Sequence, residues 1–292
     1  MSEVLSTVVE LVLNSLVLSG VFLIVALGLN IIFGLSRVVN LAHGAFYALG
    51  AYFGFTLIRS GLNFFIALIV APILVGAVGL VIEQTSISPI RKRDIHYTLI
   101  LTYGLWFFLD GLIRYSWGKA TYFTELPTFM NQTLLFAGIQ YPFYRLAILI
   151  LIAIVMAGVM LLLGKTKMGM ALRAASNIPE MVSCLGVNMR LVHVGGFALG
   201  SVLAGIAGFL AGPLYTIHPE MGHGILLSSF VVVVVGGLGS LRGSVIAALL
   251  IGTVQSLAEY FIADLAMVIV YMTMAMILAF MPRGLLGEGR FN

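Results

Sequence analysis

The residue types that catalyse reactions or hold metals are few in this chain and are not grouped. Neither an HExxH sequence nor a Gly-x-Ser-x-Gly sequence occurs, and Cys184 is the single cysteine of 292 residues. The histidines are scattered along the chain, at positions 43, 96, 193, 218 and 223. Catalysis and metal binding need several such groups in one place, so we expect neither an enzyme active site nor a metal site.

One short sequence, Gly164-Lys165-Thr166, resembles the end of a nucleotide-binding loop. The upstream glycine of such a loop stands at a fixed distance from the Gly-Lys pair, and Gly158 is one residue too far away. The residues between the two glycines are all apolar. We therefore do not expect this chain to hydrolyse ATP by itself, and we predict no cofactor for it.

Polar side chains inside apolar blocks are the better candidates for a functional role. Asn40, His43 and Tyr47 form an early group, and Ser229 and Gln255 occur in later blocks. Polar groups are costly in lipid, so they mark either a transport pathway or packing sites where a partner satisfies them. Both interpretations stay open from the sequence.

The composition is that of an integral membrane protein. Hydrophobic residues make up 61% of the chain and charged residues 9%, whereas a soluble domain has about 25% charged residues. The chain is expected to be all-α, because a membrane β-barrel would show short alternating strands. The net charge of +4 sits in short loops, so we expect membrane lipid around the chain and no nucleic acid. One transmembrane domain over 1–292 is predicted.

The apolar blocks predict a polytopic bundle of eight to ten membrane segments. A helix needs roughly 18–20 apolar residues to cross a bilayer. By the positive-inside rule, the basic clusters at 91–93, 165–190 and 283–290 are expected to be cytoplasmic, with 116–145 outside. An early re-entrant block would change the count. The expected segments are 11–36, 38–58, 60–82, 95–115, 143–164, 191–213, 224–238, 243–262 and 265–281.

A short capped helix is predicted inside the basic segment 165–190. Asn177 is placed to cap it and Glu180 follows three residues later, which is a capping-box pattern. Pro179 suits a first turn, and Gly186 is placed to end the helix. Ile178, Val182 and Leu185 would then share one apolar face. Such a helix in a membrane protein is typical of a segment held by a partner outside the bilayer.

Four stretches of the chain are similar to a known family of membrane proteins. They are GLNIIFGLSRVVNLAHGAFYALGAYFGF (28–55), GMALRAASNIPEMVSCLGVN (169–188), VVVVVGGLGSLRGSVIAALLIG (231–252) and MPRGLLG (281–287). These stretches resemble the LivH-type permeases, which are membrane subunits of branched-chain amino-acid ABC importers. The resemblance covers roughly residues 20–287, with its segments in the family's order.

This resemblance implies a permease subunit in a prokaryotic plasma membrane that imports branched-chain or hydrophobic amino acids by alternating access. It implies three kinds of protein partner: a second, LivM-like permease, two cytoplasmic ATPase subunits that bind the ATP, and an extracytoplasmic solute-binding protein. Gly44 joins the pathway candidates as part of the Asn40-x-x-His43-Gly44 signature. The ATPase-coupling residues carried over by position are Arg173, Ala174, Asn177, Glu180 and Gly186.

Other functions stay open from the sequence alone. Within the importer class, the substrate could be urea, a short amide or an aromatic acid. A channel or secondary carrier working alone would need no ATPase, and the short basic-segment helix would then have no purpose.

Overall fold

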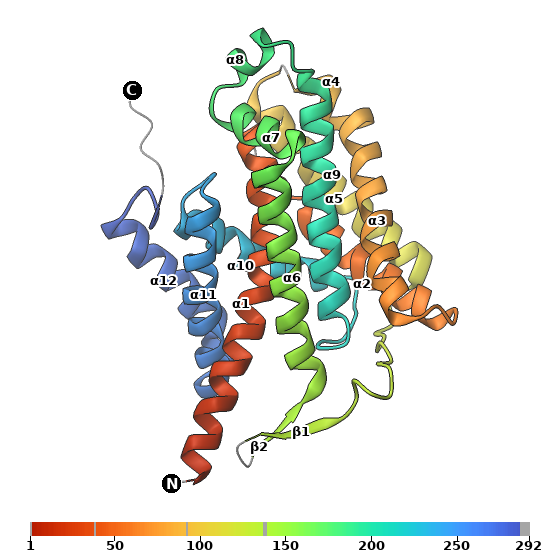
Figure 1. Cartoon of the computed structure of the whole chain (residues 1–292), viewed down its shortest axis with the longest axis vertical. Helices are drawn as coiled ribbons and strands as arrows, with labels where there is room; N and C mark the ends of the chain where they lie inside the picture. The colour runs from red at the N-terminus through yellow and green to blue at the C-terminus, as the bar shows by residue number, and fades with distance from the viewer. Residues whose placement is uncertain (1, 38, 92, 137–138, 287–292) are drawn as a thin grey trace.

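The computed structural model describes residues 2–37, 39–91, 93–136 and 139–286, so Lys92 and Arg290 of the basic clusters lie outside the described residues. Long helices dominate the chain (Figure 1). They are α1 (Ser2–Ser36), α2 (His43–Arg59), α3 (Phe64–Ile82), α5 (Ile95–Trp117), α6 (Phe143–Lys165), α9 (Met189–Ala211), α10 (Met221–Gly236), α11 (Leu241–Phe261) and α12 (Ala266–Phe280).

Shorter elements lie between these helices. A π-helical turn (Glu83–Ile87) and α4 (Ser88–Ile90) follow α3, and a 3-10 turn (Ala263–Leu265) precedes α12. The helices α7 (Lys167–Asn177) and α8 (Pro179–Cys184) follow α6. The strands β1 (Thr133–Phe136) and β2 (Ile139–Pro142) form one antiparallel hairpin, paired from Thr133 with Pro142 to Phe136 with Ile139.

Six helical stretches within the described residues are long and apolar enough to cross a membrane. With α2, α5 and α10 they make nine long helices, within the predicted range of eight to ten segments, and the all-α polytopic prediction is confirmed. The six stretches are Val4–Ser36, Phe64–Ile90, Phe143–Lys165, Met189–Ala211, Leu241–Phe261 and Ala263–Phe280.

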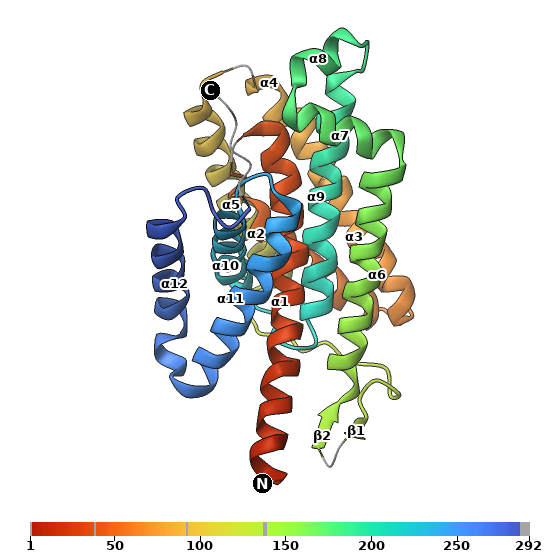
Figure 2. The ribbon, with the colours of Figure 1, turned by 60° about the vertical axis from the view of Figure 1, so that its left-hand side comes forward.

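The two ends of the bundle differ in charge. The loops around α4, α7 and α8 lie at one end, and the start of α1 and the β-hairpin lie at the other (Figures 1 and 2). We call the first the basic end, because it carries Arg91, Arg93, Lys165, Lys167, Arg173 and Arg190. The positive-inside rule predicts that the basic end is cytoplasmic.

Helix α2 begins deep inside the bundle, which the apolar block 38–58 did not predict. The Nε2 atom of His43 lies 3.1 Å from the carbonyl oxygen of Val25, about 16 Å before the end of α1 at 1.5 Å per residue. The chain therefore turns back into the protein after Arg37, the residue with a left-handed backbone (φ 54°). Residues 39–42 are not helical, and the last turns of α2 lie at the opposite end of the bundle, where Trp117 at the end of α5 donates to the Thr56 hydroxyl (2.8 Å). The block therefore crosses the bundle, and α2 forms only the second part of the crossing.

Helix α9 packs against α1, α2 and α3, and glycines make these contacts close. A Cβ atom at Gly200 would lie 2.7 Å from the carbonyl oxygen of Gly28, and one at Gly208 would overlap the carbonyl of Tyr47. Ala204 between them is fully buried. Small residues let helix backbones meet directly in a membrane, where lipid is as apolar as the side chains.

The turn between α10 and α11 is held to α1 by one side chain. The amide nitrogen of Asn30 donates to the Ser240 carbonyl (3.1 Å) and to the Ser244 hydroxyl (2.9 Å), and its oxygen accepts from the Gly239 N–H (2.7 Å). Gly237 and Gly239 have φ values of 99° and 88°, which glycine adopts without strain. The glycine-rich run around these residues therefore makes a tight turn.

Replacing Gly200 with alanine should destabilise the bundle by about 1–3 kcal/mol, because the new methyl group would meet a backbone oxygen. The measurement is the apparent unfolding temperature of the detergent-purified protein. Gly158→Ala in α6 is the matched control, since a Cβ there would meet nothing within 4 Å. In the control, the higher helix propensity of alanine should leave stability unchanged or raise it by up to about 1 kcal/mol. Equal unfolding temperatures in the two variants would contradict this account of the packing.

Candidate functional site

Helix α8 extends beyond the bundle at the basic end, and α7 packs against α1, α6 and α9 next to it (Figures 1 and 2). The Thr166 hydroxyl caps α7 by accepting a hydrogen bond from the Gly169 N–H (3.0 Å). Helix α7 ends at Asn177, and α8 follows one residue later. The predicted short helix in the segment 165–190 is thus present, but a longer helix leads into it.

The predicted capping box is wrong. The cap position of α8 is Ile178, with no side-chain cap, and Pro179 is the first helical residue. The Asn177 amide instead donates to the carbonyl of Arg173 (3.1 Å), because Asn177 is the last residue of α7. Glu180 is consequently the second residue of α8, where a negative charge still suits the positive end of the helix dipole.

The predicted end of α8 at Gly186 is confirmed. Gly186 has φ 78°, and its N–H donates to the Ser183 carbonyl (3.1 Å). The Val187 N–H donates to the Val182 carbonyl (3.4 Å). This pair of bonds is a Schellman motif, which satisfies the last carbonyls of a helix and needs a left-handed residue at the position of Gly186.

An exposed apolar face covers the outer side of α8, and its composition differs from the prediction. Ile178 is 57% exposed, Met181 61% and Leu185 78%, whereas Val182 is buried at 5%. Val182 therefore faces the protein, and Met181 takes its predicted place on the outer face. Fully burying a side chain of this kind contributes about 1.5–3 kcal/mol, so this face, which we call the α8 face, is suited to a protein partner.

Arg173 and Ala174 lie on the exposed side of α7. Asn177, Glu180 and Gly186 follow in α7, α8 and the turn after α8. All five predicted coupling residues therefore lie in one continuous segment at the basic end. Their contact with an ATPase stays a prediction.

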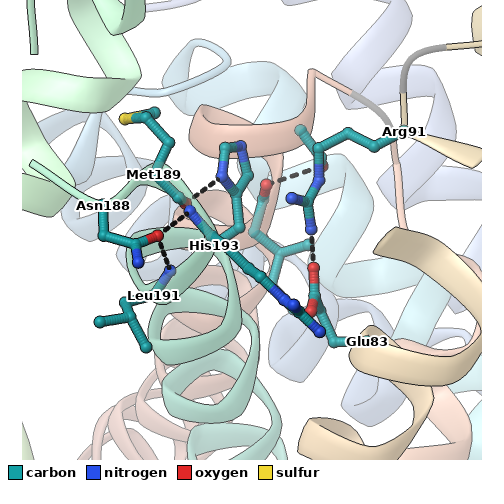
Figure 3. A network of polar contacts seen from close by, with 9 residues as sticks. Glu83, Arg91, Asn188, Met189, Leu191 and His193 are labelled. Carbon is teal, nitrogen blue, oxygen red and sulfur yellow. Dashed lines mark hydrogen bonds and ion pairs between the residues drawn. The ribbon is translucent and has the colours of Figure 1, made fainter. Parts of the chain in front are cut away.

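Polar contacts fix the start of α9, which follows α8 in the chain (Figure 3). Asn188 caps α9, its side-chain oxygen accepting from the N–H groups of Arg190 (3.0 Å) and Leu191 (3.4 Å). The Nδ1 atom of His193 lies 2.6 Å from the Met189 carbonyl oxygen. The start of α9 is thus fixed immediately after the end of α8.

Beside this cap lies an ion pair between Glu83 and Arg91, which the sequence reasoning missed (Figure 3). Glu83 is 1% exposed, and it begins the π-helical turn after α3. The available signal was an acid at the end of an apolar block, eight residues before an arginine. The pair ties the α3–α4 connection to the basic end next to His193 and α9.

Four predicted pathway residues meet at the start of α2. Asn40, His43 and Tyr47 are at most 3% exposed, and Gly44 packs directly on the carbonyl of Gly222 in α10. The Asn40 side-chain oxygen accepts from the Ala42 N–H (3.2 Å), which shapes the turn before the helix. All four lie inside the chain's own packing, between α1, α9 and α10.

The later pathway candidates lie on α10 and α11. Ser229 is fully buried on α10, one turn beyond Leu226, which packs on Gly44. The Gln255 side chain accepts from Ser228 (3.4 Å) and donates to Glu259 (2.8 Å). Ser229 therefore belongs to the same interior region as the start of α2, whereas Gln255 joins a separate polar chain along α11.

At the opposite end, one arginine on α5 forms ion pairs with two carboxylates. Arg114 donates to Asp110 (2.9 Å) and also to Glu220 (2.9 Å), just before α10. The Arg114 guanidinium lowers the pKa of Glu220 below its usual value. This link fixes the loop between α9 and α10 to α5.

Comparison with known proteins gives consistent results. The family model described as branched-chain amino acid transport system / permease component matches residues 11–278. The chain is 27% identical to the high-affinity branched-chain amino acid transport permease BraD of Pseudomonas aeruginosa, over 94% of each chain. It is 27% identical to LivH of Escherichia coli K12, covering 99% of this chain and 98% of LivH.

Two further proteins extend the comparison. LivM of Escherichia coli K12 is 28% identical, over 92% of this chain and 68% of LivM. Among solved structures, a chain of PsaBC from Streptococcus pneumoniae in complex with a Fab has the same fold, with a TM-score of 0.50 at 14% identity, covering 91% of this chain and 89% of that chain. The resemblance to LivH-type permeases is thereby confirmed. The chain belongs to the family of branched-chain amino acid transport permeases, as a multi-pass membrane subunit of an importer and not an enzyme.

Proposed function

We propose that this chain forms, together with a second permease, the transmembrane pathway of an ATP-driven importer for branched-chain or other hydrophobic amino acids. The observation that carries the proposal is the α8 face, an apolar surface presented by a short helix at the basic end. The names of the relatives BraD and LivH support the substrate class. Partner ATPases would bind the ATP, a solute-binding protein would deliver the substrate, and the membrane would be the prokaryotic plasma membrane.

The α8 face supports an ATPase partner through its chemistry. The large apolar side chains of Ile178, Met181 and Leu185 are exposed on its outer side, whereas Val182 of the same helix is buried against the protein. A buried anchor with an exposed apolar face opposite is expected where a helix inserts into a groove of a partner. A channel or carrier working alone would gain nothing from exposing these side chains to water.

The way in which α8 is attached supports an alternating-access mechanism. Movement of α8 would reach α9 through the Asn188 cap, and α9 contacts α1, α2 and α3 along its length. The buried groups at the start of α2 lie directly against this helix. We therefore propose that the two α8 helices of a permease pair transmit ATPase closure to the pathway.

The polar atoms at the start of α2 support a pathway there. Within the described residues, Asn40 Nδ2, His43 Nδ1 and Ser229 Oγ make no hydrogen bond although they are buried. Buried polar groups are normally satisfied by hydrogen bonds, so unsatisfied groups of this kind are suited to a hydrated or substrate-bound state.

The proposal of a second permease subunit is supported by the two kinds of relative, LivH and LivM.

The deciding experiment is co-purification of the tagged chain in mild detergent, followed by an ATPase assay and uptake of radiolabelled leucine in liposomes. We expect a second permease, two ATPase subunits and ATP-dependent uptake stimulated by the binding protein. Competition by urea, short amides and aromatic acids tests the alternative substrates of the same class. Solute movement by this chain alone, without ATP, would reject the proposal.

Met181→Glu combined with Leu185→Glu should weaken ATPase co-purification by at least about tenfold, since each lost apolar anchor is worth about 1–3 kcal/mol. Both side chains are exposed, so the unfolding temperature of the permease should not change. Ser183→Glu adds a charge to the same helix at an exposed polar position and serves as the control. Equal ATPase recovery in all variants would remove the α8 face from the interface.

Gly186→Ala should disturb the end of α8, because a left-handed backbone costs a residue with a side chain about 1–2 kcal/mol. We expect reduced ATPase stimulation by substrate-loaded binding protein, with normal insertion. Gly186→Asn should retain more activity, since asparagine tolerates this conformation better. If alanine and asparagine behave alike, the backbone conformation of Gly186 is not what matters.

Glu83→Leu or Arg91→Leu alone should destabilise the protein by about 3–5 kcal/mol. Each substitution removes one member of the ion pair and leaves the charge of the other member unpaired near the start of α9. The double substitution should cost less than either single one. A double-mutant cycle on unfolding temperature and transport rate measures this coupling. Additive losses would show that the two charges do not act as a pair.

A further inference from the structure

A cavity of about 730 Å³ opens at the basic end between α1, α6, α7 and α11. Helix α1 packs against both α6 and α11, and it lies between them in both views (Figures 1 and 2). The start of α11 and the last turns of α7 line the cavity at the basic end. It is distinct from the buried region at the start of α2, whose residues do not line it.

Two arginines give the cavity its charge. Arg173 enters from α7 and Arg242 from the first turn of α11. In the part of the chain that the structure describes, neither makes an ion pair, and no acidic residue lines the cavity. A cavity with two cationic groups and no counter-charge favours an anion, and the planar arginine side chain suits phosphate in particular.

Polar residues also line the cavity, at Asn30, Ser176, Asn177 and Ser240, but the wall formed by α1 and α6 is mostly apolar and continues away from the basic end. Leu27 and Ile31 of α1 and Met156, Met160 and Leu163 of α6 line the cavity. Met156 is nine residues before the end of α6, so this wall extends about 13 Å toward the membrane interior at 1.5 Å per residue. A free anion would use only the arginines, whereas a lipid would use both the charged and the apolar parts.

We propose that this cavity binds an anionic phospholipid of the leaflet at the basic end. Arg173 and Arg242 hold the headgroup phosphate, and the wall formed by α1 and α6 holds the acyl chains. Basic pockets between transmembrane helices on the cytoplasmic side are suited to anionic headgroups. Arg173 belongs to the helix that leads into α8, so the bound lipid would fix the coupling segment against the bundle.

The test is lipid binding by the purified full chain, and it does not depend on transport or on an ATPase. Dioleoyl-phosphatidylglycerol is titrated into the detergent-solubilised protein, and bound lipid is counted by native mass spectrometry. Dioleoyl-phosphatidylcholine is the neutral comparison. We expect one tightly bound phosphatidylglycerol and no equivalent phosphatidylcholine.

Two variants separate the charge from the shape of the site. Arg173→Gln with Arg242→Gln should weaken binding roughly 25-fold, about fivefold for each arginine. Arg93→Gln with Arg283→Gln removes the same charge from loops outside the cavity and should leave binding unchanged. Gly164→Trp should block the cavity without altering charge, whereas Gly158→Trp, on the same helix outside the cavity, should not. Equal unfolding temperatures establish that each variant is folded.

Three results would overturn the proposal. The first is phosphatidylglycerol binding that is the same in the arginine variant and in its loop control. The second is equal binding of phosphatidylcholine, which would make the site a nonspecific apolar surface. The third is displacement of the lipid by millimolar inorganic phosphate with no effect of Gly164→Trp, which would assign the arginines to a free anion.

Discussion

Direct contact between helix backbones at glycines is the constraint on which this structure depends. Gly28 meets Gly200, Gly50 meets Gly205, and Gly44 meets Gly222, so α1, α2, α9 and α10 approach without intervening side chains. Lipid is as apolar as leucine, so such helices gain their association from close packing and not from escape from water. The same contacts make α9 a rigid element, because three neighbouring helices fix its position.

Polar side chains then fix the places where the backbone departs from helix inside this packed bundle. Asn30 satisfies the turn between α10 and α11, and Asn40 shapes the turn before α2. Irregular backbone at membrane depth is tolerated only where protein or water satisfies its polar groups. The two asparagines therefore explain how both turns can lie against α1, and why polar residues occur in otherwise apolar blocks.

The sequence predicts the long helices well, since charged residues bound apolar blocks such as 143–164 and 191–213, which became α6 and α9. It does not predict that residues 39–42 are non-helical and that α2 begins inside the bundle, because the block 38–58 is apolar in either case. Spacing also cannot separate Met181 from Val182 as outer-face residues, since both are one turn from Ile178 and only tertiary packing decides between them. Asn177 was assigned to the wrong helix because its side chain can serve the end of α7 as well as the start of α8.

The absence of a side-chain cap on α8 has a physical consequence for how this helix can transmit force. A helix of six residues without a side-chain cap is not stable by itself. Its shape must come from Val182, which is buried behind it, from the turn at Gly186, and from the Asn188 cap that begins α9. Val182 faces the bundle, and the other two attachments follow the C-terminal end of α8, which leaves the outer face free to contact a partner. A force applied to that face has only these attachments through which to act, so α9, with its glycine contacts, is the element that must respond first.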